Sequence, residues 1–72
     1  MSKKARFLEL RFTKLIGREL APLSICDQVD LIKKVLRPYI LNEFTDEGIT
    51  IPPEFSLVWA RCKAIIEKEV GV

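Results

Sequence analysis

Histidine is absent from this 72-residue chain, and its two cysteines, Cys26 and Cys62, stand far apart. Histidine is the commonest general base and a principal zinc ligand, and two isolated thiols do not complete a zinc site. We therefore expect no catalytic residue, no metal site and no cofactor. Both cysteines are interpreted as small hydrophobic side chains.

Glycine and long apolar runs are also scarce. The three glycines are scattered, so they cannot form a glycine-rich phosphate-binding loop. No apolar run approaches the roughly 18 residues that a membrane-spanning helix requires. Two cysteines are too few for a disulfide framework, and the opening residues MSKKARF contain no apolar signal segment. These absences predict a cytoplasmic protein without a membrane span.

Apolar residues, by contrast, are plentiful at 49% of the chain. A chain of this length corresponds to one domain, which we expect to span residues 1–72. So small a domain cannot bury all of its apolar surface, and a contiguous surplus outside usually marks an interface. The composition therefore predicts a protein partner or a second copy of the chain, with a homodimer as the first expectation.

The apolar periodicity predicts an all-α fold, a small bundle of three main helices. The first helix is expected over 3–16, where Ala5, Leu8 and Phe12 share one face. A strand is the alternative here, because Leu8, Leu10 and Phe12 alternate with polar residues. Helix is favoured, because the sequence offers no second convincing strand for pairing.

Glycine, serine and proline residues set the expected helix boundaries. Gly17 is expected to cap the C-terminus of the first helix, and Ser24 the N-terminus of the second. Pro38 is predicted to kink or break the second helix, with a short fourth helix after it as an alternative. Pro53 suits the first position of the last helix.

The apolar faces also predict which side chains are buried and which contact a partner. The expected core consists of Leu8, Phe12, Ile16, Val29, Ile32, Leu36, Ile40, Phe55, Trp59, Cys62 and Ile66. Further apolar positions in and after the second helix are candidate partner contacts, namely Leu31, Val35, Tyr39, Leu41 and Phe44. Tyr39 and Phe44 are the expected anchors, because aromatic side chains often dominate binding energy.

The charges are strongly divided along the chain. Residues 1–18 carry six cations against one carboxylate, a net charge of +5, whereas residues 19–54 have a net charge of −4. The cations of the first segment are Lys3, Lys4, Arg6, Arg11, Lys14 and Arg18. Most of them fall on the helical face opposite the apolar one, and Phe7 projects among them. This face predicts a binding surface for nucleic acid phosphates, for anionic lipid, or simply for solvent.

Two further patterns bear on function. Residues 18–37 resemble a helix-turn-helix in outline, but Pro22 occupies the turn, and Asp27 and Asp30 would face DNA phosphates. The acidic residues near the end of the second helical stretch, Glu43, Asp46 and Glu47, call for compensation by the basic first segment, by a second copy or by a cation.

Together these observations predict a small non-enzymatic protein–protein interaction module of the regulator, adaptor or inhibitor type. Its apolar surplus would support self-association, and its charged poles would set orientation and association rate. The alternative is a nucleic-acid-binding protein that uses the basic first helix.

Overall fold

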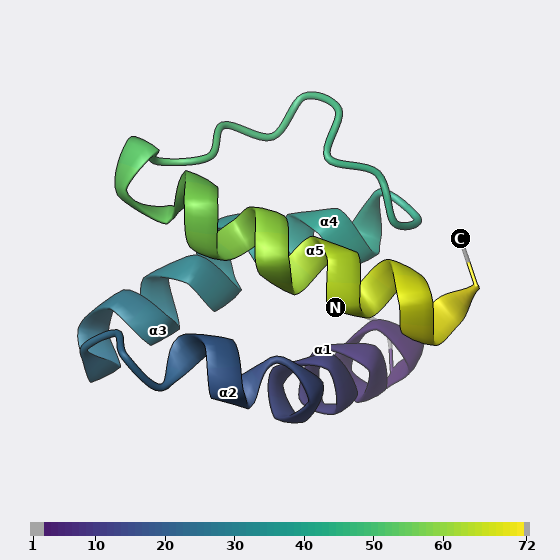
Figure 1. Ribbon diagram of the computed structural model, residues 1–72. Helices are drawn as coiled ribbons and strands as arrows, with labels where there is room; N and C mark the ends of the chain where they lie inside the picture. The colour runs from purple at the N-terminus through teal and green to yellow at the C-terminus, as the bar shows by residue number, and fades with distance from the viewer. Residues whose placement is uncertain (1–2, 72) are drawn as a thin grey trace.

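Helices account for all the regular secondary structure in the computed structural model, which describes residues 3–71 (Figure 1). Since no strand occurs within residues 3–71, the all-α prediction is confirmed and the strand alternative for 3–16 is wrong. The elements are α1 (Lys3–Leu15), α2 (Gly17–Leu20), α3 (Ile25–Leu31), the π-helical segment η1 (Ile32–Leu36), α4 (Arg37–Leu41), the 3₁₀ turn η2 (Pro53–Phe55) and α5 (Ser56–Val70).

The elements enclose one core. In Figure 1, α5 crosses the middle of the molecule, α1 and α2 run along one side of it, and the loop 42–52 arches over the other side. Helix α1 packs against α2, α4 and α5, and α2 also packs against α5. The resulting body measures 27 × 24 × 23 Å. The predicted domain limits include residues 1, 2 and 72, which lie outside the described residues.

The expected helix boundaries are partly confirmed. Ser24 caps α3, since its hydroxyl accepts a hydrogen bond from the Asp27 N–H at 3.1 Å. Pro53 is the first residue of η2, which leads directly into α5. Gly17 does not cap α1: after a turn at Ile16, it begins α2. The left-handed glycine cap lies instead at Gly71, with φ of 75° at the end of α5.

The π-helical segment η1 explains the behaviour of the second helical stretch. Helical backbone continues from α3 through η1 into α4, and the Arg37 N–H bonds the Ile32 carbonyl five residues back. Pro38 offers no N–H, and its ring would clash with the carbonyl of Lys34 in a regular α-helix. A wider turn just before Pro38 relieves that conflict. The interruption predicted at Pro38 therefore takes the form of a π turn, followed by a short α4.

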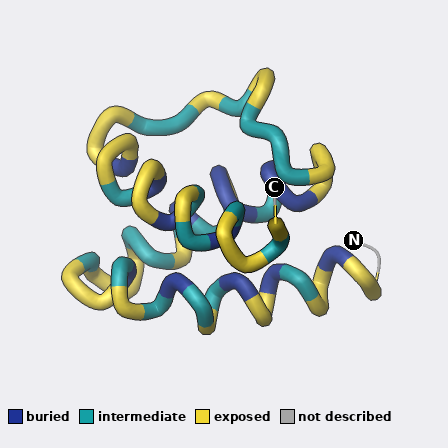
Figure 2. The backbone as a smooth tube through the Cα atoms, turned by 45° about the vertical axis from the view of Figure 1, so that its right-hand side comes forward, coloured by how far each residue is buried: buried dark blue, intermediate teal, exposed yellow. Residues whose placement is uncertain are grey.

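The core contains most of the expected residues. All of the predicted set are buried except Leu8 and Ile32, which are half-buried, and Val29, which is exposed. The prediction for Val29 is wrong because η1 changes the helical phase. Buried side chains lie there at Leu31, then at the pair Val35 and Leu36, then at the pair Tyr39 and Ile40, a period somewhat longer than the roughly 3.6 residues of an α-helix. Figure 2 shows how buried and exposed residues alternate along the helices.

Four aromatic rings join the separate parts of the core. Phe12 of α1 contacts Phe44 of the loop edge-on, with ring centroids 5.8 Å apart. Phe44 in turn contacts Tyr39 of α4 at 6.0 Å, and Tyr39 contacts Trp59 of α5 at 5.1 Å. Edge-to-face pairs at these separations are favourable beyond the area that they bury. This row of rings connects α1, α4, α5 and the loop 42–52.

The end of α4 holds two consecutive residues in a left-handed conformation. The Glu43 N–H bonds the Ile40 carbonyl and the Phe44 N–H bonds the Tyr39 carbonyl, which is the Schellman pattern. Glycine is the usual residue where Glu43 stands, with φ of 56°, and Phe44 follows with φ of 69°. A non-glycine residue in this conformation costs about 1–2 kcal/mol. The packing of the Phe44 ring on Tyr39 compensates for that strain.

Replacement of Tyr39 by phenylalanine is expected to stabilise the fold. The Tyr39 hydroxyl is fully buried and has no hydrogen-bond partner among the described residues, and desolvation raises its pKa. Removal of an unpartnered buried hydroxyl recovers about 1 kcal/mol of its desolvation penalty. We expect Tyr39→Phe to raise the free energy of unfolding by that amount in urea denaturation. A destabilised variant would show that the hydroxyl has a stabilising partner.

Candidate functional site

The outer face of α1 is rich in exposed cations. All six cations predicted as a phosphate-binding set are exposed. Five lie on α1 and one on α2, namely Lys3, Lys4, Arg6, Arg11 and Lys14 on α1 and Arg18 on α2. The opposite face of the helix lies in the core through Ala5 and Phe12. The division expected from the sequence between a buried apolar face and a solvent-facing basic face is therefore present.

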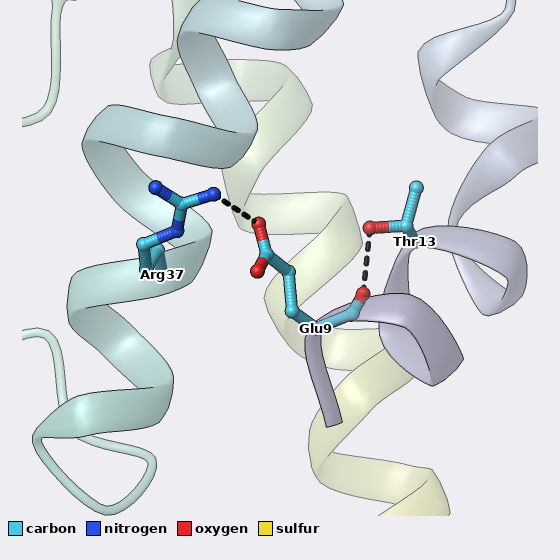
Figure 3. Close-up of polar contacts among 3 residues, drawn as sticks. All are labelled: Glu9, Thr13 and Arg37. Carbon is cyan, nitrogen blue, oxygen red and sulfur yellow. Dashed lines mark hydrogen bonds and ion pairs between the residues drawn. The ribbon is translucent and has the colours of Figure 1, made fainter. Parts of the chain in front are cut away.

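A part-buried ion pair holds the inner face of α1 toward α4. Glu9 is the only carboxylate on α1 and is 8% exposed. Its Oε1 accepts a hydrogen bond from Arg37 Nη2 of α4 at 2.9 Å, and its backbone carbonyl accepts one from the Thr13 hydroxyl (Figure 3). Because the lone carboxylate points inward, no acidic side chain of α1 reduces the charge of the outer face.

Two large apolar side chains lie in the middle of this basic face. Phe7 is 64% exposed and Leu10 is 60% exposed. Together with Arg11 and Lys14 they line a shallow depression of about 340 Å³. Residues at spacings of three and four lie side by side on a helix, so the four form one continuous strip. Sequence reasoning identified Phe7 on the basic face but missed Leu10, whose spacing from Phe7 carried the same signal.

One cation of the strip already binds a carboxylate. Arg11 Nη2 donates to Glu69 Oε1 of α5 at 2.7 Å, and both side chains are more than 40% exposed. An exposed pair of this kind contributes less than about 1 kcal/mol to stability. It does show the chemistry that complements the strip, which is a carboxylate approaching beside the apolar pair.

The predicted partner contacts are corrected by burial. Leu31, Val35 and Tyr39 are fully buried, so they form the core and cannot contact a partner. The phase change at η1 turns them inward. Leu41 is 55% exposed and Phe44 is half-buried, so these two remain available at the surface.

Leu41 and Phe44 line a second hollow together with residues of α1. The pocket has a volume of about 190 Å³ and lies between the N-terminal part of α1 and the end of α4. Its lining consists of Lys4, Ala5, Leu8, Ile40, Leu41, Glu43 and Phe44. Lys4 of the predicted basic set and two predicted partner contacts therefore meet at one place. Sequence reasoning missed this meeting, because it depends on how α1 and α4 pack.

Of the three acidic residues after α4, Asp46 pairs with a cation of the same chain. Asp46 Oδ2 accepts a hydrogen bond from Lys63 Nζ of α5 at 2.8 Å, which lowers the pKa of Asp46 and raises the pKa of Lys63. Glu43 lies with Lys4 at the pocket. Asp46 therefore pairs with a cation of α5, which was not among the compensating partners expected.

The cysteines do not form a reactive pair. Cys62 is fully buried, and desolvation raises the pKa of its thiol to about 11. It is therefore a protonated thiol at neutral pH and a poor nucleophile. Cys26 is exposed at the start of α3. Within residues 3–71, no group of three or more histidine, cysteine, aspartate or glutamate side chains could hold a metal ion.

Comparisons of the chain with protein families, with curated proteins and with solved structures give no match. Across the described part of the chain, no helix has both the length and the apolar character needed to cross a membrane. The site is accordingly interpreted from its own residues.

The Glu9–Arg37 pair is expected to matter far more than the exposed Arg11–Glu69 pair. Glu9→Gln leaves the Arg37 guanidinium, whose Nε is already buried without a partner, with a weaker neutral acceptor. We expect a loss of about 1–3 kcal/mol in the free energy of unfolding, as for a hydrogen bond to a charged group. Glu69→Gln is the matched control and should cost less than about 0.5 kcal/mol. Equal losses in urea denaturation would contradict this ranking.

Proposed function

We propose that this chain is a small non-enzymatic protein–protein interaction module whose α1 outer face binds an acidic partner. The observation that carries the proposal is the pair of exposed apolar side chains, Phe7 and Leu10, among the five exposed cations of α1. An apolar centre with a charged rim is the usual anatomy of a protein interface. The carboxylate of Glu69 on Arg11 is an internal example of the partner chemistry.

The roles within the face follow from exposure and charge. Phe7 and Leu10 supply the apolar contact, and burial of such side chains contributes roughly 1.5–3 kcal/mol each. The cations attract and orient an acidic surface, which accelerates association more than it strengthens binding. A module of this kind acts by occupying its partner's surface, as a regulator, adaptor or inhibitor does.

Nucleic acid is the second candidate ligand, because the same six cations could contact phosphates and Phe7 could stack on a base. Leu10 distinguishes a protein partner from nucleic acid as the ligand. An aliphatic side chain contributes to a protein interface but has no π-face for stacking, and Leu10 lines the depression together with Phe7. This position favours a protein partner.

Self-association away from α1 is part of the proposal. Two outer faces of α1 would bring like charges together, so a homodimer must use another surface. Ile25 is the most exposed large apolar side chain at 79%, and Val29 lies one turn further along α3. Cytoplasmic location also belongs to the proposal, in keeping with the exposed thiol of Cys26, which that compartment would keep reduced.

A fluorescence anisotropy titration tests the acidic-partner proposal. The probes are a labelled random copolymer of glutamate and tyrosine, labelled polyglutamate, and a labelled DNA duplex. We expect the copolymer to bind best, because it alone offers both carboxylates and apolar groups. Phe7→Ser combined with Leu10→Ser should weaken copolymer binding at least tenfold, which corresponds to about 1.4 kcal/mol. Leu57→Ser, an equally exposed position on α5, is the control and should change nothing.

The same titration distinguishes the nucleic-acid alternative. Phosphate contacts make affinity fall steeply with salt, whereas apolar contact does not. Replacement of Arg11, Lys14 and Arg18 by glutamine should weaken binding of any anionic probe. Tighter binding of the duplex than of the copolymer, with no effect of Leu10→Ser, would overturn the protein-partner proposal.

Light scattering across a dilution series tests self-association. We expect a dimeric mass for the native chain, because α3 leaves Ile25 and Val29 uncovered. Ile25→Glu should shift the chain to monomer, whereas Phe7→Glu should leave the dimer intact. A monomeric mass for the native chain at every concentration would contradict the homodimer.

A further inference from the structure

The pocket between α1 and the end of α4 differs in kind from the strip beside it. The strip lies on one helix, whereas the pocket has walls from two elements that are far apart in sequence, Leu8 of α1 and Ile40 and Leu41 of α4. Phe44, which closes it, is held by its ring contacts with Phe12 and Tyr39. The walls therefore belong to the packed body of the protein, and the pocket exists before a ligand arrives.

The backbone turn after α4 is what brings Glu43 and Phe44 to the pocket. Both residues adopt left-handed conformations that L side chains avoid, although glycine at the Glu43 position would relieve the strain there. Their N–H groups are held by the carbonyls of Ile40 and Tyr39. The turn thus places a carboxylate at a pocket on the otherwise cationic side of the molecule.

The charges of the lining are complementary rather than uniform. Lys4 contributes a cation from α1 and Glu43 contributes a carboxylate from the α4 end, with Ala5, Leu8, Ile40, Leu41 and Phe44 supplying the apolar lining. A ligand that fits this arrangement carries an apolar group between an acidic group facing Lys4 and a basic group facing Glu43. A helix or extended segment of a protein offers these three groups on neighbouring side chains.

The size of the pocket fits one side chain. Its volume is about 190 Å³. An apolar cavity of about 150 Å³ accepts a benzene molecule, so this pocket accepts a phenyl ring or a branched aliphatic group. The pocket adjoins the strip, because Lys4 and Leu8 lie within one helical turn of Phe7 and Arg11.

We propose that this pocket receives a phenylalanine or leucine side chain of the same acidic partner, and so anchors the segment that the α1 strip attracts. The inference rests on the proposed function, because it takes its partner from there. It adds the register of binding: the partner carries an apolar anchor, an acidic residue on the α1 side of it and a basic residue on the Glu43 side.

Methyl NMR of the full chain tests the pocket directly. The probe is N-acetyl-L-phenylalaninamide, which is uncharged, and N-acetylglycinamide is the control ligand. We expect saturable shifts of the Leu8, Ile40 and Leu41 methyl groups with the phenylalanine derivative only, and none at Ile25 and Leu57. Leu41→Ser removes one apolar wall at an exposed position, where folding tolerates it, and should weaken these shifts severalfold.

Copolymer binding then separates this inference from the proposed function. We expect Leu41→Ser to weaken binding of the glutamate–tyrosine copolymer three- to tenfold. Glu43→Gly should preserve the fold without weakening copolymer binding, because the copolymer carries no basic group for the Glu43 carboxylate. Unchanged copolymer affinity in Leu41→Ser, with the expected loss in the Phe7 and Leu10 double variant, would overturn the anchor pocket alone. Pocket shifts without any copolymer binding would support the pocket and overturn the acidic partner.

Discussion

The row of rings from Phe12 through Phe44 and Tyr39 to Trp59 is the contact on which the arrangement of this protein depends. Each ring comes from a different part of the chain, so the row fixes α1, the loop 42–52, α4 and α5 relative to one another. A 72-residue domain has a small core, and edge-on aromatic pairs add to what its burial alone supplies. Phe44 also lines the pocket beside α1, so the ring contacts that hold Phe44 in place also hold that wall of the pocket.

Two ion pairs add to the aromatic contacts in holding the elements together. The Glu9–Arg37 pair sets the rotation of α1 about its axis, and the outer face receives only cations and the apolar pair Phe7 and Leu10. The Asp46–Lys63 pair holds the loop against α5. The acidic middle of the sequence is thus partly used to hold the fold together, which leaves the basic segment as the charged surface open to other molecules.

The sequence was sufficient to predict what depends on local periodicity. The α1 faces, the Ser24 cap and the start of the last helix at Pro53 all follow from spacing and side-chain chemistry within one element. The prediction that Leu31 and Val35 contact a partner is wrong, because a π turn widens the helical period around them and a single proline does not reveal how the backbone adapts to it. The pocket could not be predicted, because Lys4 and Glu43 meet only through the packing of α1 against α4.

The π turn also determines where this chain can tolerate a change of length. It accommodates Pro38 with the equivalent of one extra residue inside a continuous helix. Insertion of a further residue into 32–36 would rotate everything after it by about 100°. Arg37 would then turn away from Glu9, and Tyr39 would leave the aromatic row. The loop 42–52 is not helical, so a change in its length does not rotate the elements that follow it. Natural variation in length should therefore accumulate in this loop and be absent from η1.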